Sequence, residues 1–385
     1  MTLTHVECGY VPLVDSAPLI IARELRFAAD EGIDLHLLRQ PSWSALRDLL
    51  ALGHLDVAHM LSPMPVAMSL GLGGFPAQID ALMVLSVNGN TIGVSNDIAQ
   101  RMRDAGWSGA FNDPHGTSDA LLAAANGPLR VGLPFHFSMH RLLFEYWLKA
   151  HPDCGPDSYE IIAIPPPRMA EAVGQGDIDV FCVGEPWGSL AVDAGVGELI
   201  LPGSVIWRFA PEKVLGARRD WSAENPTTCA GLMRAVYRAA AWLDTPSNHA
   251  LAAEILARSD HLNLPDHAID HALSGQFMTR QGGAPVHTPN FLKFHRSAAT
   301  FPWRSQAAWI AQQLSSDLEG GTDCFRSDIY RQHLGPVGVD MPGASAKLEG
   351  AMQHPTAVAS TKGHMILGPD AFFDGVIFDS EQSER

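Results

Sequence analysis

Apolar runs and a helical pattern alternate along residues 161–187. A β-branched run, Ile161–Ile164, leads into three prolines, and a helical pattern follows that ends at Gly174 and Gly176. An Asp-Val pair at 179–180 then opens a second apolar run. Glycine commonly ends a helix, and short apolar runs on either side of a helical pattern are typical of strands. This stretch therefore predicts a β-α-β unit.

Residues 33–65 repeat that organisation. An apolar run and a proline precede a helical pattern from Trp43 to Leu52, Gly53 ends the pattern, and Asp56-Val57 opens the next apolar run. Short apolar strands separated by helices indicate parallel sheets that are covered on both faces. We therefore expect an α/β protein built from two similar lobes, with its binding site in the cleft between them.

The rest of the chain supplies further elements. Asp15 or Ser16 is expected to cap a helix with Pro18 in its first turn, Asn96 is expected to cap another helix, and residues 108–117 are expected to form a loop. Further β-rich runs lie at residues 5–10, 81–87, 91–94, 129–133, 198–201 and 205–209, and long helical patterns lie at 226–243, 249–257 and 301–315.

Asn88-Gly89-Asn90 separates two of the β-rich runs and has two interpretations. Asn-Gly favours a tight hairpin turn, but these residues could equally form the first crossing from one lobe to the other. A return crossing is expected near residues 207–218. The tail that begins at Pro342 is expected to wrap the first lobe.

Composition narrows the classes of function. The 385 residues are enough for two or three domains of about 100–200 residues each. The chain has 26 Lys and Arg against 42 Asp and Glu, a formal net charge of −16. This charge disfavours nucleic acid or an anionic membrane as a direct partner. An anionic ligand would have to be held by local positive groups.

Cysteine usage and the first residues bear on the compartment. The five cysteines include no CxxC pair, which favours free thiols in a reducing environment. Residues 1–12 lack the basic and apolar regions of a signal peptide, and no run reaches the ~18 apolar residues of a membrane span. We therefore expect a cytoplasmic protein, unless a leader has been removed.

Trp43 and two histidine pairs are candidate site residues. Trp43 stands where a loop becomes a helix, so it could donate its indole N–H to an anion at the helix N-terminus, or simply pack on its own helix. His136 and His140 are four apart, but a zinc site would need a third ligand and the HExxH glutamate. We expect one of them to face the cleft, and His267 and His271 to lie on the surface.

Lys213 and Glu185 are candidate charged residues. Lys213 is a lone cation at the start of an apolar run, where it could be a ligand or an ordinary surface lysine. Glu185 ends a strand, where it could hold a cation or cap the next helix. No glycine-rich loop has the context of a P-loop or a dinucleotide site, and no catalytic triad can be located. The sequence thus predicts a binding protein, not an enzyme, with no metal and no cofactor.

Several segments together resemble the nitrate/bicarbonate-binding proteins of ABC importers. The resemblance spans nearly the whole chain and is most specific at Cys182–Trp187. It rests on Asp15–Ala22, Ser42-Trp43 with Arg47-Asp48, Ser62–Pro65, Val87–Gly89, Pro165–Met169, Cys182–Trp187, Pro211–Lys213, Phe373–Gly375 and Phe378-Asp379. It implies the type II periplasmic-binding-protein fold with two hinge crossings. Residues 1–90 would form the first part of lobe 1 and residues 91–208 would form lobe 2. Residues 209–385 would return to lobe 1 and add the C-terminal helices and tail.

Without an export signal, the chain is more similar to the cytoplasmic nitrate/nitrite sensors (NasS type) of nitrate assimilation operons. That resemblance implies a partner, an ANTAR-domain antiterminator, which the sensor holds inactive until nitrate or nitrite binds. The alternative is the solute-binding subunit of a nitrate or bicarbonate importer. The pyrimidine-precursor synthases of the wider fold are disfavoured, because this chain has no clustered cysteines.

The resemblance also implies the residues that contact the anion. Trp43, His140 and Lys213 match the family's contacting residues, and Asn90 stands where the family has a glutamine. Ser138 and Glu185 are expected to support these residues. The segment before His140 differs from the family, because Phe135–Ser138 replaces a glycine-rich turn.

Overall fold

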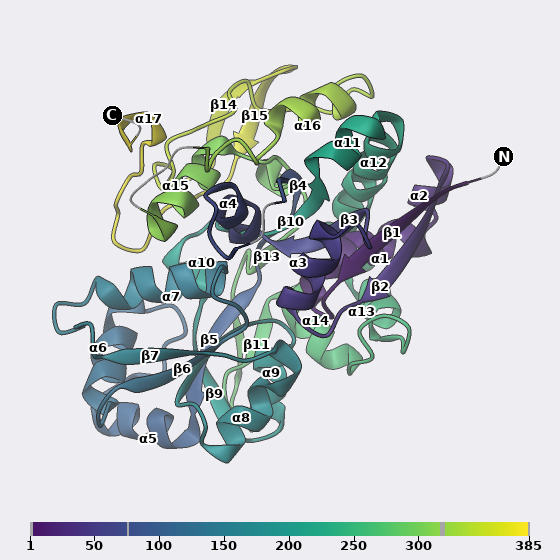
Figure 1. Ribbon diagram of the computed structural model, residues 1–385. Helices are drawn as coiled ribbons and strands as arrows, with labels where there is room; N and C mark the ends of the chain where they lie inside the picture. The colour runs from purple at the N-terminus through teal and green to yellow at the C-terminus, as the bar shows by residue number, and fades with distance from the viewer. Residues whose placement is uncertain (1–2, 75–76, 316–319, 384–385) are drawn as a thin grey trace.

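The computed structural model describes residues 3–74, 77–315 and 320–383. Two lobes lie side by side, each with its own β-sheet between helices (Figure 1). The predicted α/β fold with two lobes is confirmed.

Lobe 1 contains a six-stranded sheet in the order β13-β4-β10-β3-β1-β2. Its strands are β1 (Thr4–Tyr10), β2 (Ile33–Arg39), β3 (Val57–Leu61), β4 (Ile79–Asn88), β10 (Pro211–Arg218) and β13 (Leu292–Lys293). Its helices are α1 (Ala17–Glu24), α2 (Phe27–Asp30), α3 (Trp43–Ala51), α4 (Pro63–Ser69), α11 (Arg219–Glu224), α12 (Pro226–Leu243), α13 (His249–Ala257), α14 (Asp266–Ser274), α15 (Arg304–Leu314) and α16 (Ser327–Leu334).

Lobe 2 contains a five-stranded sheet in the order β7-β6-β8-β5-β9. Its strands are β5 (Asn90–Ser95), β6 (Leu129–Leu133), β7 (Tyr159–Ala163), β8 (Val180–Gly184) and β9 (Gly197–Pro202). Its helices are α5 (Asn96–Asp104), α6 (Pro114–Ala124), α7 (Met139–Lys149), α8 (Met169–Gln175), α9 (Trp187–Asp193) and α10 (Gly203–Ile206).

Short elements complete the structure. Two hairpins, β11 (Gln276–Met278) with β12 (Pro285–His287) and β14 (Thr356–Ser360) with β15 (Gly363–Leu367), stand outside the two large sheets. The 3-10 turns are η1 (Val14–Ser16), η2 (Pro166–Arg168), η3 (Pro246–Asn248) and η4 (Arg296–Ala298), and α17 (Ser380–Ser383) lies near the C-terminus.

The two predicted β-α-β units occupy equivalent places in the two sheets. The first unit places β2 and β3 on either side of β1, all parallel, and the second places β7 and β8 on either side of β6. In each sheet the next strand is antiparallel, β10 beside β3 and β5 beside β8. The duplication expected from the sequence is therefore present in the strand order.

Asn88-Gly89 forms the first crossing between the lobes. β4 pairs with β10 and β13 in lobe 1, whereas β5 pairs with β8 and β9 in lobe 2, so the hairpin interpretation is wrong. The chain returns to lobe 1 through residues 203–210. Asn88 joins the two crossings, because its Nδ2 donates to Arg208 O (3.0 Å) and its Oδ1 accepts from Ala210 N (3.2 Å).

Some local predictions were wrong. Residues 205–209 are not a strand, since α10 covers Gly203–Ile206 and the run is apolar because Ile206 and Trp207 are buried. The loop predicted at 108–117 ends early, because Asp113 Oδ1 accepts from Gly116 N and Pro114 starts α6. The cap of α5 is Ser95, whose side chain accepts from Ile98 N.

The C-terminal tail packs on both lobes rather than on lobe 1 alone. Phe372 stacks on Trp207 of the return crossing, with ring centroids 4.7 Å apart. Tyr146 on α7 of lobe 2 donates to Asp374 Oδ2 at 2.7 Å. The tail's aromatic residues thus find their apolar contacts where the lobes meet.

Among the described residues, no helix is both long enough and apolar enough to cross a bilayer. Cys8, Cys182, Cys229 and Cys324 are buried free thiols, and Cys154 is a half-buried one.

Candidate functional site: a buried cluster between the lobes

Trp43, Asn90, His140 and Lys213 lie together where the lobes meet. Trp43 is the first residue of α3 and Lys213 lies in β10, both in lobe 1, whereas Asn90 begins β5 and His140 is in the first turn of α7 in lobe 2. All four side chains are buried, so the lobes are closed over them.

Lys213 carries its ammonium group into the interior, and its interpretation as a surface lysine is wrong. The residue is 0% exposed. Its Nζ lies 2.6 Å from Asp15 Oδ2 and 2.9 Å from Glu212 Oε1, and 5.4 Å from the centre of the Trp43 ring. Burial alone would lower the pKa of Lys213, but the charges of Asp15 and Glu212 outweigh it and raise this pKa. Lys213 is therefore a buried cation.

Asp15 belongs to this cluster and not to a helix cap. Its side chain makes no capping hydrogen bond to η1 or α1. It contacts Lys213 and, through Oδ1, His59 Nε2 at 3.0 Å. Burial raises the pKa of Asp15, but Lys213 and His59 outweigh that effect and bring it down to about 2. Asp15 is thus a buried carboxylate.

Glu212 connects the residues of the two lobes. Its Oε1 accepts from Lys213 and lies 3.3 Å from His140 Nδ1, while its Oε2 accepts from Asn90 Nδ2 at 2.8 Å. Burial is the largest influence on the pKa of Glu212 and raises it. Neighbouring residues of a regular strand point to opposite faces. β10 has an irregular register between Pro211 and Lys213, which lets Glu212 and Lys213 meet.

Two donors of the cluster are left without partners. Among the described residues, neither Trp43 Nε1 nor either ring nitrogen of His140 forms a hydrogen bond, although all three atoms are buried. Burial, together with the charge of Lys213, lowers the pKa of His140 well below its usual value. His140 is therefore neutral at pH 7, with one ring N–H to donate. Unpaired buried donors are costly, so these two need an acceptor.

Gly184 keeps space open beside the cluster. A Cβ atom at this position would lie 3.6 Å from Asp15 Oδ2 and 3.7 Å from His140 Nε2, and it would collide with Leu13. Gly184 ends β8 in lobe 2, and Asp15 and Leu13 belong to lobe 1. A larger residue here would occupy the space between the lobes at the unpaired His140 nitrogen.

The predicted supporting residues cap helices. Ser138 caps α7, since its Oγ accepts from Arg141 N at 3.2 Å, and it thereby orients the turn that carries His140. Glu185 accepts from Ser189 N (3.1 Å) in α9 and from Thr91 Oγ1 (2.8 Å). Of its two interpretations, capping the next helix is the one that these bonds support.

The other candidate histidines differ in burial. His136 is exposed, so it does not join His140 in a metal pair. His267 is exposed, as expected, with Nε2 3.1 Å from Asp193 Oδ2, whereas His271 is half-buried. His59, which the sequence interpretation missed, is buried in β3, and its ring centre lies 5.5 Å from that of Trp43.

The cluster has the chemistry of a site for a small anion. It offers one ammonium group and two unpaired N–H donors. The N-termini of α3 and α7, which carry Trp43 and His140, add positive dipole ends from opposite lobes. A planar oxyanion accepts hydrogen bonds from all of these groups. Two lobes joined by two crossings, with a buried site between them, are the architecture of the type II periplasmic-binding-protein fold.

Comparisons with known proteins agree with this class. A model of the NMT1-like family matches residues 2–257. The chain is 29% identical to the nitrate/nitrite binding protein NrtA of Synechococcus elongatus, over 98% of this chain and 84% of that protein. It is 30% identical to NrtA of a Nostoc species, over 99% of this chain and 84% of the relative.

A solved structure and a longer relative extend the comparison. The crystal structure of the periplasmic nitrate-binding protein NrtA from Synechocystis PCC 6803 matches with a TM-score of 0.84 and 27% identity, over 99% of this chain and 97% of that one. The nitrate import ATP-binding protein NrtC of Synechocystis is 32% identical over 81% of this chain, which is 46% of the relative. The chain therefore belongs to the NMT1-like family, among the solute-binding relatives of NrtA.

Proposed function

We propose that this protein binds nitrate or nitrite at Trp43, His140 and Lys213. The observation that carries the proposal is the pair of buried, unpaired donors, the Trp43 indole N–H and the ring N–H of neutral His140, which lie beside Lys213 on elements from opposite lobes. The relatives include nitrate/nitrite binding proteins, which supports this ligand.

Lys213 has the capacity to contact the anion while it keeps its two carboxylate partners. An ammonium group has three N–H donors, and Asp15 and Glu212 account for two of them. The third N–H, the indole and the imidazole then give one donor for each oxygen of nitrate. Charge-assisted hydrogen bonds of this kind are about twice as strong as neutral ones.

Binding would be coupled to movement of the lobes. The site is buried in the closed arrangement, so the anion must reach it from an open one. An anion held by Trp43 of lobe 1 and His140 of lobe 2 stabilises the closed form, because the open form separates its donors.

We further propose that the closed form is a signal inside the cell. The resemblance to NasS-type sensors supports an ANTAR-domain antiterminator that binds the open form and is released when nitrate or nitrite closes the lobes. By linkage, the partner then weakens nitrate binding by the same factor by which nitrate weakens partner binding. Shifting the complex from 99:1 to 1:99 requires about 5.5 kcal/mol of differential affinity.

The second candidate function is delivery of nitrate or bicarbonate to an importer, which the names of NrtA and NrtC favour. Co-purification distinguishes the two. A sensor is recovered with an antiterminator encoded beside it, and saturating nitrate releases it. A complex that survives nitrate and nitrite, or no complex at all, favours the importer.

Calorimetric titration with nitrate, nitrite, bicarbonate and sulfate tests the ligand itself. One equivalent of nitrate or nitrite should bind, and more tightly than bicarbonate. Nitrate and nitrite carry no proton at neutral pH, so all their oxygens can accept hydrogen bonds, whereas bicarbonate keeps an O–H group. Sulfate should bind poorly, because its second negative charge would face Asp15 and Glu212. Tight binding of bicarbonate with no response to nitrate would contradict the proposed ligand.

A further inference from the structure

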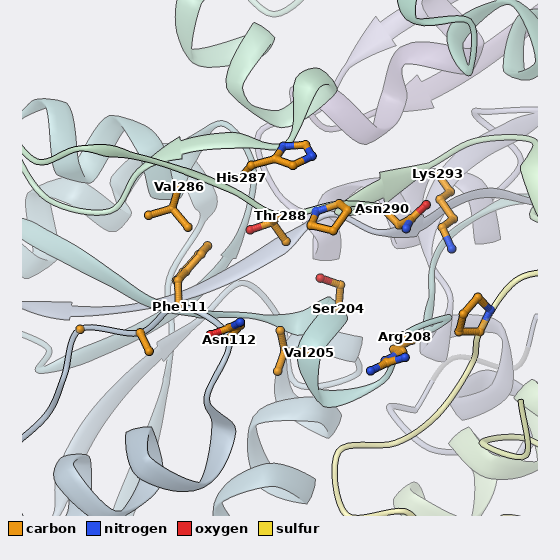
Figure 2. Close-up of a pocket in the computed structure, with 14 residues that line it drawn as sticks. Phe111, Asn112, Ser204, Val205, Arg208, Val286, His287, Thr288, Asn290 and Lys293 are labelled. Carbon is orange, nitrogen blue, oxygen red and sulfur yellow. The ribbon is translucent and has the colours of Figure 1, made fainter. Parts of the chain in front are cut away.

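A second cavity lies against the return crossing, away from the cluster around Lys213. Its volume is about 640 Å³, within the range of small-molecule sites. It is lined by the loop before α6, by the return crossing, by residues 286–290 with Lys293, and by Pro369 (Figure 2). None of Trp43, His140 and Lys213 lines it.

The charge of this cavity is opposite to that of the whole protein. Its lining includes Arg208 and Lys293 and no Asp or Glu, in a chain with a net charge of −16. Within the described part of the chain, neither side chain forms an ion pair. A cavity that gathers two free cations in an acidic protein attracts anions.

Lys293 is buried at this cavity without an acidic side chain paired to it, within the described part of the chain. The residue is 4% exposed, and its Nζ lies 5.2 Å from the centre of the Phe209 ring. Burial and the charge of Arg296 lower the pKa of Lys293 to about 8. The acid that acts on it, Asp244, already accepts from the backbone N–H groups of residues 294–296. An anion that enters the cavity would stabilise this buried ammonium, which has no carboxylate partner of its own.

The cavity has a cationic end and an apolar end. Figure 2 shows Arg208 and Lys293 on its right-hand side and Phe111 and Val286 on its left. Ser204 and Asn112 lie between them and provide hydrogen-bonding groups. A ligand that fits both ends carries a negative group on an apolar body.

We propose that this cavity binds an organic anion of metabolite size, with a carboxylate or phosphate at Arg208 and Lys293 and an apolar body toward Phe111 and Val286. Such a ligand touches both lobes and the crossing between them. Lys293 lies on β13 of lobe 1, Phe111 belongs to lobe 2, and Arg208 is joined to the first crossing through Asn88. The ligand therefore shifts the balance between open and closed lobes, which makes the cavity an effector site.

The direct test is calorimetric titration of the nitrate-free protein with phenyl phosphate and with benzoate, and with benzyl alcohol as a neutral analogue. At least one of the two anions should bind with one-to-one stoichiometry, and the preferred anion distinguishes a phosphate from a carboxylate ligand. Benzyl alcohol should not bind. Failure of both anions to bind at millimolar concentration, or equal binding of the alcohol, would overturn the proposal.

Variants locate the site. Arg208→Gln and Lys293→Met should each weaken binding about tenfold or more, as expected for the loss of a charge-assisted contact. Arg168→Gln, which removes an exposed cation elsewhere in lobe 2, should leave it unchanged. Arg208 is exposed, so Arg208→Gln decides the question even where Lys293→Met fails to fold. Unchanged binding in Arg208→Gln would overturn the assignment.

The effector role rests on the proposed nitrate function and is tested separately. The affinity for nitrate, measured with and without saturating phenyl phosphate or benzoate, should differ in the wild type and not in Arg208→Gln. Equal nitrate affinities with and without the organic anion in the wild type would overturn the coupling between the two sites. The direct titration would still decide whether the cavity binds the anion. Absence of nitrate binding in either condition would count against the proposed function alone.

Discussion

Asp15 and Glu212 allow Lys213 to keep its charge in the protein interior. The ammonium nitrogen of Lys213 lies 2.6 Å from the Asp15 carboxylate and 2.9 Å from the Glu212 carboxylate, and all three side chains are buried. A buried ion pair contributes little net stability, but removal of one partner leaves a buried charge without compensation. Single substitutions in this cluster therefore report on stability as well as on binding.

Lys213→Ala should lower the free energy of unfolding by about 3–5 kcal/mol, because it leaves Asp15 and Glu212 without their cation. The double variant Asp15→Asn/Lys213→Met removes one charge of each sign and should recover most of that loss. Urea unfolding at pH 7 measures both, with Lys362→Ala as the exposed control. A double variant as unstable as Lys213→Ala would contradict the ion-pair account.

Asp15 should also make stability depend on pH in acid. Its pKa in the folded protein is about 2, below the usual value of 3.8. A carboxyl with a depressed folded pKa contributes stability that is complete above the unfolded pKa and is lost as pH falls through the folded one. The wild type should therefore lose roughly 2 kcal/mol between about pH 4 and pH 2 that Asp15→Asn does not lose.

Urea unfolding at a series of pH values checks this prediction. Asp97→Asn, which alters an exposed carboxylate, is the matched control and should follow the wild type. If Asp15→Asn and the wild type lose stability in parallel over that window, Asp15 is not the group responsible.

Nitrate binding should be accompanied by proton uptake. Burial disfavours the charged form of both groups, because it raises the pKa of Glu212 and lowers that of His140, so the neutral His140 ring adds no positive charge before the anion arrives. An added anion raises the pKa of both groups. Since the complex then binds more protons than the free protein, affinity should increase as pH falls from about 8 to 6.

Calorimetry in two buffers with different ionisation enthalpies measures that uptake. Glu212→Gln should reduce the number of protons taken up per nitrate. Identical heats in the two buffers throughout the range would show that the anion binds without protonation of the cluster.

Residue types and a family resemblance were sufficient to predict Trp43, Asn90, His140 and Lys213, and the structure brings them together. Asp15, His59 and Glu212 were missed. Asp15 precedes a helix, where a capping role is the usual one. Glu212 was missed because its contact with Lys213 depends on an irregularity of β10, which no residue pattern reports.

Among the secondary-structure elements, the two crossings and the glycines beside them define how the lobes meet. Gly203 begins α10 in the return crossing, and a Cβ there would collide with Asn90 Oδ1 at the start of β5. A side chain at this point would displace Asn90, which donates to Glu212. The crossings thus hold part of the site in place.

Gly203→Ala should therefore destabilise the protein by about 1–3 kcal/mol, the usual cost of overpacking, and should weaken nitrate binding. Thermal unfolding and nitrate titration measure the two effects. Gly155→Ala is the control, because the nearest atom to its new Cβ is 4.0 Å away. Wild-type stability in Gly203→Ala would mean that the crossings do not approach each other this closely.

Periodic segments were predicted well, and segments defined by tertiary contacts were not. The two β-α-β units and the helix Pro226–Leu243 follow from apolar spacing and glycine stops alone. The hairpin β14–β15 and the placement of the tail do not, because Phe372 and Phe373 find their partners on Trp207 and Tyr146, far away in the sequence. A sequence pattern does not encode which distant surfaces meet.

For the molecule as a whole, a net charge of −16 surrounds a site that we assign to an anion. Long-range attraction therefore does not bring nitrate to the cleft, and the affinity has to come from short-range donors in a closed, desolvated space. Tight binding therefore requires the lobes to close around the anion, and the bound anion in turn stabilises the closed lobes. The C-terminal tail is linked to lobe 2 by the hydrogen bond from Tyr146 to Asp374.

The most direct test of the central claim is calorimetric titration of nitrate into the wild type and into folded Asp15→Asn/Lys213→Met. The wild type should bind one nitrate per chain. The double variant should lose about 2–5 kcal/mol of binding free energy, because it lacks the cation that faces the ligand. Wild-type affinity for nitrate in the double variant would contradict the assignment of the site to Lys213.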